Sequence, residues 1–124
     1  MNFEQTIEAM LAAAAKGAKG QWDAMNEHAE SEFRRLTAAA MKLEASYAAD
    51  MAEAALQTNA KKRAKMEKIA KERTRLAFEN LELAAETVVE MAQADMKLAA
   101  QDAVNAAIEV LLTAVNTSLG VPLL

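Results

Sequence analysis

The sequence predicts an all-α protein, with a short N-terminal helix and a long antiparallel helical hairpin that assembles into a homo-oligomeric bundle or coiled coil. The 124 residues include 31 alanines but only three glycines and one proline, and alanine favours helices that Gly and Pro break. Apolar residues recur three and four positions apart, the helical period. Leu, Ile, Val and Phe total only 25, a thin core that favours self-association of a single domain.

The first helix is expected over about 3–16. Asn2 followed by Gln5 resembles a capping box, in which the Asn2 side chain accepts from the first free backbone N–H groups. Apolar residues follow at helical spacing. Gly17 and Gly20 then bracket an expected break or kink.

The second helix is expected over about 21–57. Its apolar positions alternate in steps of three and four, which is the heptad seam of a coiled coil. They are Phe33, Leu36, Ala40, Leu43 and Tyr47.

The third helix is expected as one rod over about 60–119, because the apolar stripe continues through this range without Gly or Pro. Its members include Met66, Ile69, Leu76, Val88, Met91, Leu98, Ile108, Leu111, Leu112 and Val115. Gly120 and Pro122 give the expected stop.

A chain reversal near 58–60 places acidic residues of the second helix opposite basic residues of the third. Glu53 then lies opposite Lys65, Asp50 opposite Lys68, and Glu44 opposite Arg75. The same register sets Arg35 against Glu82 and Arg34 near Glu86, and it lets the first helix cover the apolar C-terminal end. The alternative is one unbroken helix over 21–119. Its long face would be basic over 61–75 and acidic from Glu79 to Glu90. Such a face would pair with itself in an antiparallel dimer centred near Ala77.

Residues 61–75, KKRAKMEKIAKERTR, hold eight basic and two acidic side chains within a chain of net charge −4. Such a stretch could bind phosphates. It has no aromatic residue on which a base could stack, and Met66 and Ile69 occupy core spacing. We therefore expect a face paired with acidic helices in preference to a nucleic-acid site.

No catalytic or metal-binding motif is present. His28 is the single histidine, and the Glu-x-x-His pairs of di-iron bundles are absent. There is no cysteine and no Gly-rich phosphate loop. The sequence predicts a protein without enzymatic activity, cofactor or metal. The chain has no cysteine for disulfides, and its N-terminus lacks the basic region and apolar run of a signal peptide. We therefore expect a cytoplasmic protein, or a virion component if phage-encoded.

The segment 103–124 carries one charge, Glu109, and is the most apolar part of the chain. Asn105, Glu109 and Asn116 interrupt it as a membrane span, and no basic residue flanks its end. We expect a buried seam here, with a membrane, a hydrophobic granule or a partner's groove as the alternatives.

The predicted function is a helical assembly or adaptor module. Its seam comprises Phe33, Leu36, Leu43, Tyr47, Leu76, Val88, Met91, Ile108, Leu111, Leu112 and Val115. The short, Ala-rich, Cys-free composition resembles that of phasins, which coat bacterial polyester granules, and of small helical proteins inside phage virions. The resemblance implies an alternative function as an amphipathic coat protein. A third is nucleic-acid binding through 61–75.

Overall fold

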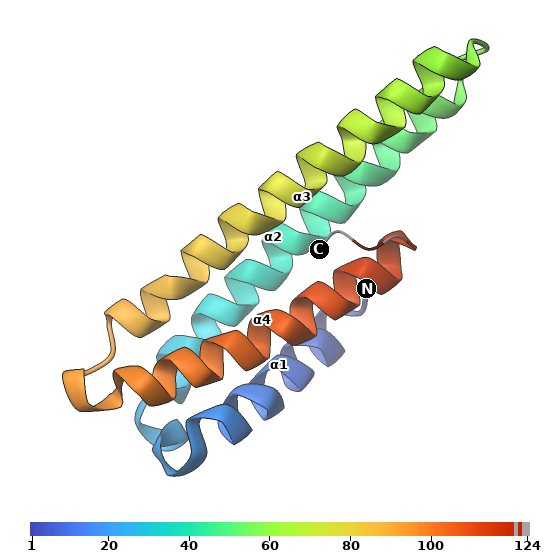
Figure 1. The fold of residues 1–124 in the computed structure, drawn as a ribbon. Helices are drawn as coiled ribbons and strands as arrows, with labels where there is room; N and C mark the ends of the chain where they lie inside the picture. Colours follow the sequence, from blue (N-terminus) through green and yellow to red (C-terminus); the bar gives the residue numbers. More distant parts are fainter. Residues whose placement is uncertain (121, 123–124) are drawn as a thin grey trace.

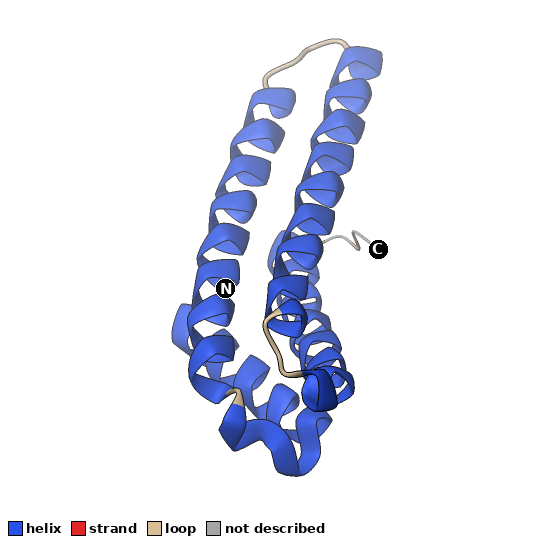
Figure 2. Ribbon diagram, turned by 90° about the vertical axis from the view of Figure 1, so that its left-hand side faces the viewer, coloured by secondary structure: helices blue, strands red, loops and turns tan. Residues whose placement is uncertain are grey.

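The computed structural model describes residues 1–120 and 122, and these are helical almost throughout. The α-helices are α1 (Phe3–Ala18), α2 (Asn26–Ala55), α3 (Ala60–Glu90) and α4 (Lys97–Leu119). Two short 3₁₀ segments, η1 (Lys19–Ala24) and η2 (Ala94–Met96), lie in the connections α1–α2 and α3–α4. The all-α prediction is confirmed (Figures 1 and 2).

The predicted hairpin is present, and it excludes an unbroken helix over 21–119. The chain reverses over residues 56–59, and α2 and α3 run side by side in opposite directions (Figures 1 and 2). Asn59 begins α3, because its side-chain oxygen accepts from the backbone N–H groups of Lys61 and Lys62 at 3.0 and 3.1 Å. A side-chain cap thus marks the turn in the absence of Gly or Pro.

The prediction of one helix over 60–119 is wrong. Helix α3 ends at Glu90, Gln93 is extended with ψ 151°, and the chain turns back into α4. The turn contains no Gly or Pro, so the cause is tertiary packing. A straight rod would leave the apolar stripe of residues 100–115 in water. Folding back buries six side chains of this stripe. Burial of each large one stabilises the fold by about 1.5–3 kcal/mol. The six are Ala100, Ala103, Val104, Ala107, Leu111 and Val115.

Helix α1 packs along α4 in the antiparallel sense (Figure 1). The first helix thus covers the apolar C-terminal helix, as predicted. The contact is close because small residues meet: Ala14 and Ala18 on α1, and Ala103 and Ala107 on α4, are buried. Gly17 lies directly against the α4 backbone at Asp102. It therefore sits inside α1 and permits close packing. The break lies just after it, at Lys19, between the two glycines that were expected to bracket it.

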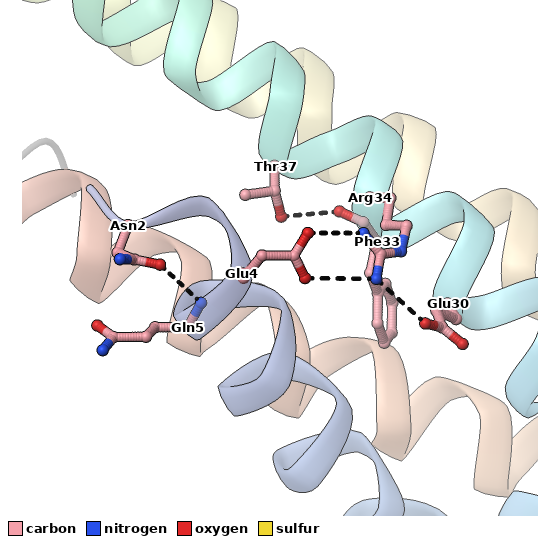
Figure 3. Close-up of polar contacts among 7 residues, drawn as sticks. All are labelled: Asn2, Glu4, Gln5, Glu30, Phe33, Arg34 and Thr37. Atoms are coloured by element: carbon pink, nitrogen blue, oxygen red, sulfur yellow. Dashed lines mark hydrogen bonds and ion pairs between the residues drawn. The ribbon is translucent and has the colours of Figure 1, made fainter.

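The N-terminus of α1 is fixed by polar contacts (Figure 3). Asn2 Oδ1 accepts from the Gln5 backbone N–H at 2.9 Å, the bond expected for the cap. Arg34 of α2 donates to Glu4 at 3.1 Å and to Glu30 at 3.5 Å. The hydrogen bond to Glu4 raises the pKa of Arg34. The expectation that Arg34 lies near Glu86 is wrong, because α1 supplies its partner.

The molecule has a bundle end and an arm (Figure 1). At the bundle end, α1 and α4 cover the neighbouring halves of α2 and α3 around Phe33, Leu36 and Phe78. Beyond it, the tip of the hairpin extends as two helices alone. The arm buries only a few side chains between its helices: Ala54, Ala70 and Thr74.

Lys19, directly after α1, has φ 56° and ψ −125°, a conformation that side chains with a Cβ rarely adopt. We expect Lys19→Gly to raise the free energy of unfolding by about 1 kcal/mol, because glycine adopts this conformation without steric cost. Urea unfolding followed by circular dichroism measures the change. Lys16→Gly, in the last turn of α1, serves as the control and should be destabilising. An unchanged midpoint for Lys19→Gly would contradict the assignment of strain.

Candidate assembly interface on α3

Most of the predicted seam lies inside the chain. Phe33, Leu36, Leu43 and Tyr47 of α2, Val88 of α3, and Leu111 and Val115 of α4 are all buried. Ile108 and Leu112 are partly buried against the same core. These positions were predicted to form a seam between copies, whereas in the structure their neighbours are helices of the same chain. The seven buried side chains are therefore not exposed to a second copy.

Leu76 and Met91 of the predicted seam are exposed, and so are two further residues of α3. Ile69, Leu76 and Leu83 are 48%, 49% and 70% exposed. They are spaced by seven residues, so they form one straight row, which we call the outer stripe. The buried residues Ala70, Thr74, Phe78, Ala85 and Val88 occupy the opposite side of the helix. Helix α3 thus has two apolar faces, and α2 and α4 cover only one of them.

Exposed apolar side chains concentrate on this part of the chain. Among the described residues, seven large hydrophobic side chains are exposed, and four of them lie on α3 or at its C-terminal end. The others, Met41, Leu56 and Leu98, are scattered over α2, the hairpin turn and α4. Single apolar residues scattered over a surface are normal, whereas several on one face of one helix make that face a candidate interaction site.

The charges along α3 divide into two halves. The first half carries the basic stretch 61–75, and the second carries Glu79, Glu82, Glu86 and Glu90. Arg75, in the middle, binds both Glu72 and Glu79 of its own helix. The hydrogen bond to Glu72 raises the pKa of Arg75, and the reverse effect lowers the pKa of Glu72. Partial burial, and then the neighbouring Glu79, raise the pKa of Glu82.

The predicted charge pairs between α2 and α3 are mostly absent. Asp50 pairs with Arg73 at 3.5 Å, in place of Lys68. Glu44 lies 3.8 Å from the amino group of Met1, and Arg35 pairs with Glu32 of its own helix. Glu53 lines a shallow groove with Asp50 and Arg73. In the described part of the chain, Arg73 and Arg75 alone supply the ion pairs of the basic stretch. Lys65 and Lys68 are exposed to solvent.

The prediction that the basic stretch faces acidic residues of its own chain therefore holds only for Arg73 and Arg75. Several of the ion pairs that do form lie within one helix, because pairs three or four positions apart form without ordering a second helix. Exposed pairs between helices are each worth at most about 1 kcal/mol and cannot impose the register.

Helix α4 belongs to the bundle core. One segment, Ala94–Leu119, has the length and apolar composition of a membrane span. Its most apolar face is packed against α1 and the hairpin, as the burial of Val104, Leu111 and Val115 records. Core helices of soluble proteins meet the same criterion, so this segment does not decide where the protein resides. Residues 121, 123 and 124 of the predicted C-terminal seam lie outside the described residues.

Within residues 1–120 and 122, no group of three or more His, Cys, Asp or Glu side chains is placed to hold a metal ion. The outer stripe and its flanking charges are thus the surface that calls for a functional explanation. No protein-family model, curated protein or solved structure matches this chain.

Proposed function

We propose that this protein is a non-catalytic helical assembly module whose copies associate through the outer stripe of α3 in the antiparallel sense. The observation that carries the proposal is the combination of a straight apolar row with opposite charges at its two ends. An apolar row alone would suit many partners. A row that is basic at one end and acidic at the other is complementary to itself when a second copy is reversed.

One register satisfies both the apolar and the charged residues. With Leu76 opposite Leu76 of the second copy, Ile69 of each chain lies opposite Leu83 of the other. In an antiparallel pair, residues on one flank of a helix meet the same flank of its partner. This register then sets three basic residues opposite, or within two positions of, three acidic ones: Lys61 and Glu90, Lys65 and Glu86, Lys68 and Glu82.

The expected association is weak and reversible. A coiled coil has two apolar residues per heptad, whereas the outer stripe has one, because the intervening positions include Glu72 and Glu79. The charge pairs add specificity more than affinity. Helix α3 is about 46 Å long at ~1.5 Å per residue, so the contact is extended but thin.

The first test is the mass in solution, measured by light scattering over a hundredfold dilution. The expected result is a shift from a dimer towards the 13.4 kDa chain as the concentration falls. Leu76→Glu should give a monomer throughout, because it places two carboxylates opposite each other at the centre. Leu56→Glu is the matched control, since Leu56 is 80% exposed but lies in the hairpin turn away from the stripe. A monomer at every concentration of the natural chain would overturn the proposal.

The second test addresses direction. Lys65→Glu and Glu86→Lys should each weaken the dimer, because each sets like charges opposite each other. The chain that carries both substitutions should recover, since the carboxylate introduced at position 65 would face the ammonium introduced at position 86 of the second copy. A parallel pair would not show this recovery, because each residue would then meet its own counterpart. Absence of recovery in a chain that still dimerises would exclude the antiparallel arrangement.

A second candidate function, nucleic-acid binding, is favoured by the exposure of the basic stretch at the arm. Lys61, Lys62, Lys65, Lys68 and Lys71 are all exposed there. Retention on immobilised DNA or RNA that falls steeply with salt would support it. The two functions separate in one variant: Leu76→Glu abolishes self-association but leaves every basic residue in place.

A further inference from the structure

A second feature, independent of the outer stripe, lies at the end of the molecule where both short connections meet (Figure 1). The α1–α2 and α3–α4 turns border a cavity of about 360 Å³. Its lining includes three methionines and the single histidine: Met25, Met91, Met96 and His28. Apart from Gln93, the remaining lining residues are apolar, namely Ala24, Val88 and Ala92.

His28 stands out because its Nε2 atom is buried and has no hydrogen-bond partner among the described residues. Buried polar atoms in proteins are nearly always paired, and an unpaired one calls for an explanation such as a water or an ion. Nε2 is also one of the two imidazole atoms that bind metals. His28, which carries this unpaired nitrogen, and three methionines thus line one cavity.

Two short segments bring these residues together. Met25 and His28 lie one turn apart at the start of α2, and Met91 and Met96 flank the turn between α3 and α4. Met25 is buried, whereas Met91 is 69% exposed and lies at the cavity rim. Methionine has three rotatable side-chain bonds, so the sulfurs can adjust to a bound ion without movement of the backbone.

We propose that Met25, His28, Met91 and Met96 form a binding site for a soft monovalent metal ion of the Cu(I) and Ag(I) class. Thioether sulfur selects soft metals, and one imidazole completes a coordination set of the kind Cu(I) accepts. Zn²⁺ is disfavoured by the absence of thiolate or carboxylate in the lining. A single positive charge also suits an apolar cavity better than a double one, because the cost of removing an ion from water rises with its charge.

His and carboxylate motifs in the sequence do not reveal this site, because its ligands are mostly thioethers, whose usual role is packing. The signal available in the sequence is only the spacing Met-x-x-His. Its meaning depends on the turn that brings Met91 and Met96 to the same end of the molecule.

The direct test is a titration of the natural chain with Ag(I), which serves as the probe for the soft monovalent class. Methionine methyl groups are labelled with ¹³C and followed by NMR. The signals of Met25, Met91 and Met96 should shift and saturate at one ion per chain, while those of Met10, Met41, Met51 and Met66 stay in place. Equal shifts of all methionines, or no shift of the three, would overturn the proposal.

Variants supply the second readout. Met91→Leu combined with Met96→Leu preserves apolar volume and should lower Ag(I) affinity at least about 100-fold, since losing even an outer-shell partner costs about 10- to 100-fold. Met41→Leu combined with Met66→Leu is the control and should bind as the natural chain does. Undiminished binding by the first pair would exclude the site. Circular dichroism establishes that each variant is folded. In a separate competition titration, Zn²⁺ should not displace Ag(I) from the natural chain.

Discussion

Leu111→Ala is expected to lower the free energy of unfolding by about 2–5 kcal/mol, which is a large part of the stability of a small domain. Leu111 is fully buried in the core cluster that joins α4 to the other helices. Its removal forfeits the transfer free energy of the side chain and leaves a cavity that rigid helices fill poorly. Urea unfolding of the natural chain and the variant measures the difference.

Leu98→Ala is the matched control, because it is the same substitution in the same helix at a side chain that is 77% exposed. Its expected effect is within about 0.5 kcal/mol. Similar small effects at both positions would mean that α4 does not pack as a core helix in solution. Its apolar segment would then be free for a membrane or a hydrophobic surface, and the coat-protein function would become the better explanation.

The position of α4 also changes what a truncation can show. Removing 103–124 would delete Val104, Leu111 and Val115 from the core, so the remaining chain is expected to unfold. Loss of surface binding or of oligomeric state in such a truncation would report unfolding and not function. Single substitutions on exposed residues, such as Leu76→Glu, avoid this problem because they leave the core intact.

The sequence alone predicted the helices where local signals mark their ends. Asn2 caps α1 and Gly120 ends α4 with φ 73°, both as expected, and the reversal expected near 58–60 falls where Asn59 caps α3. The turn at 91–96 was missed because it has no local signal. Its residues are compatible with a helix, and the free energy that breaks the helix comes from burying α4 against α1, which no local pattern contains.

The candidate interface was predicted only in part, for a related reason. Helix α3 carries two apolar rows, and a helical period does not say which row faces the partner helix. Leu76 was identified as a seam residue, and Ile69 as part of the stripe, but Leu83 was missed. The seven-residue spacing of the three is readable in the sequence. Their exposure is not, because it depends on α2 and α4 covering the opposite row.

Gly17→Ala is expected to destabilise the protein by about 1–3 kcal/mol, the usual cost of forcing a carbon into a packed contact. A Cβ at this position would lie 2.7 Å from the backbone oxygen and 2.9 Å from the carbonyl carbon of Asp102. Backbone atoms of α4 cannot rotate away as a side chain can, so α1 must move off α4. Helix propensity predicts the opposite sign, since Ala is better than Gly inside a helix by up to about 1 kcal/mol.

Gly20→Ala separates these two effects, because a Cβ at Gly20 would meet no atom within 4 Å and its φ is not positive. At Gly20, alanine lowers the chain entropy of the unfolded state, so the free energy of unfolding should stay unchanged or rise by about 0.4–1 kcal/mol. Urea unfolding of both variants gives the comparison. Opposite signs would establish that α1 and α4 touch backbone to backbone at Gly17. A gain at both positions would mean that the helices are further apart, and that the Ala-rich contact between them does not hold the bundle end together.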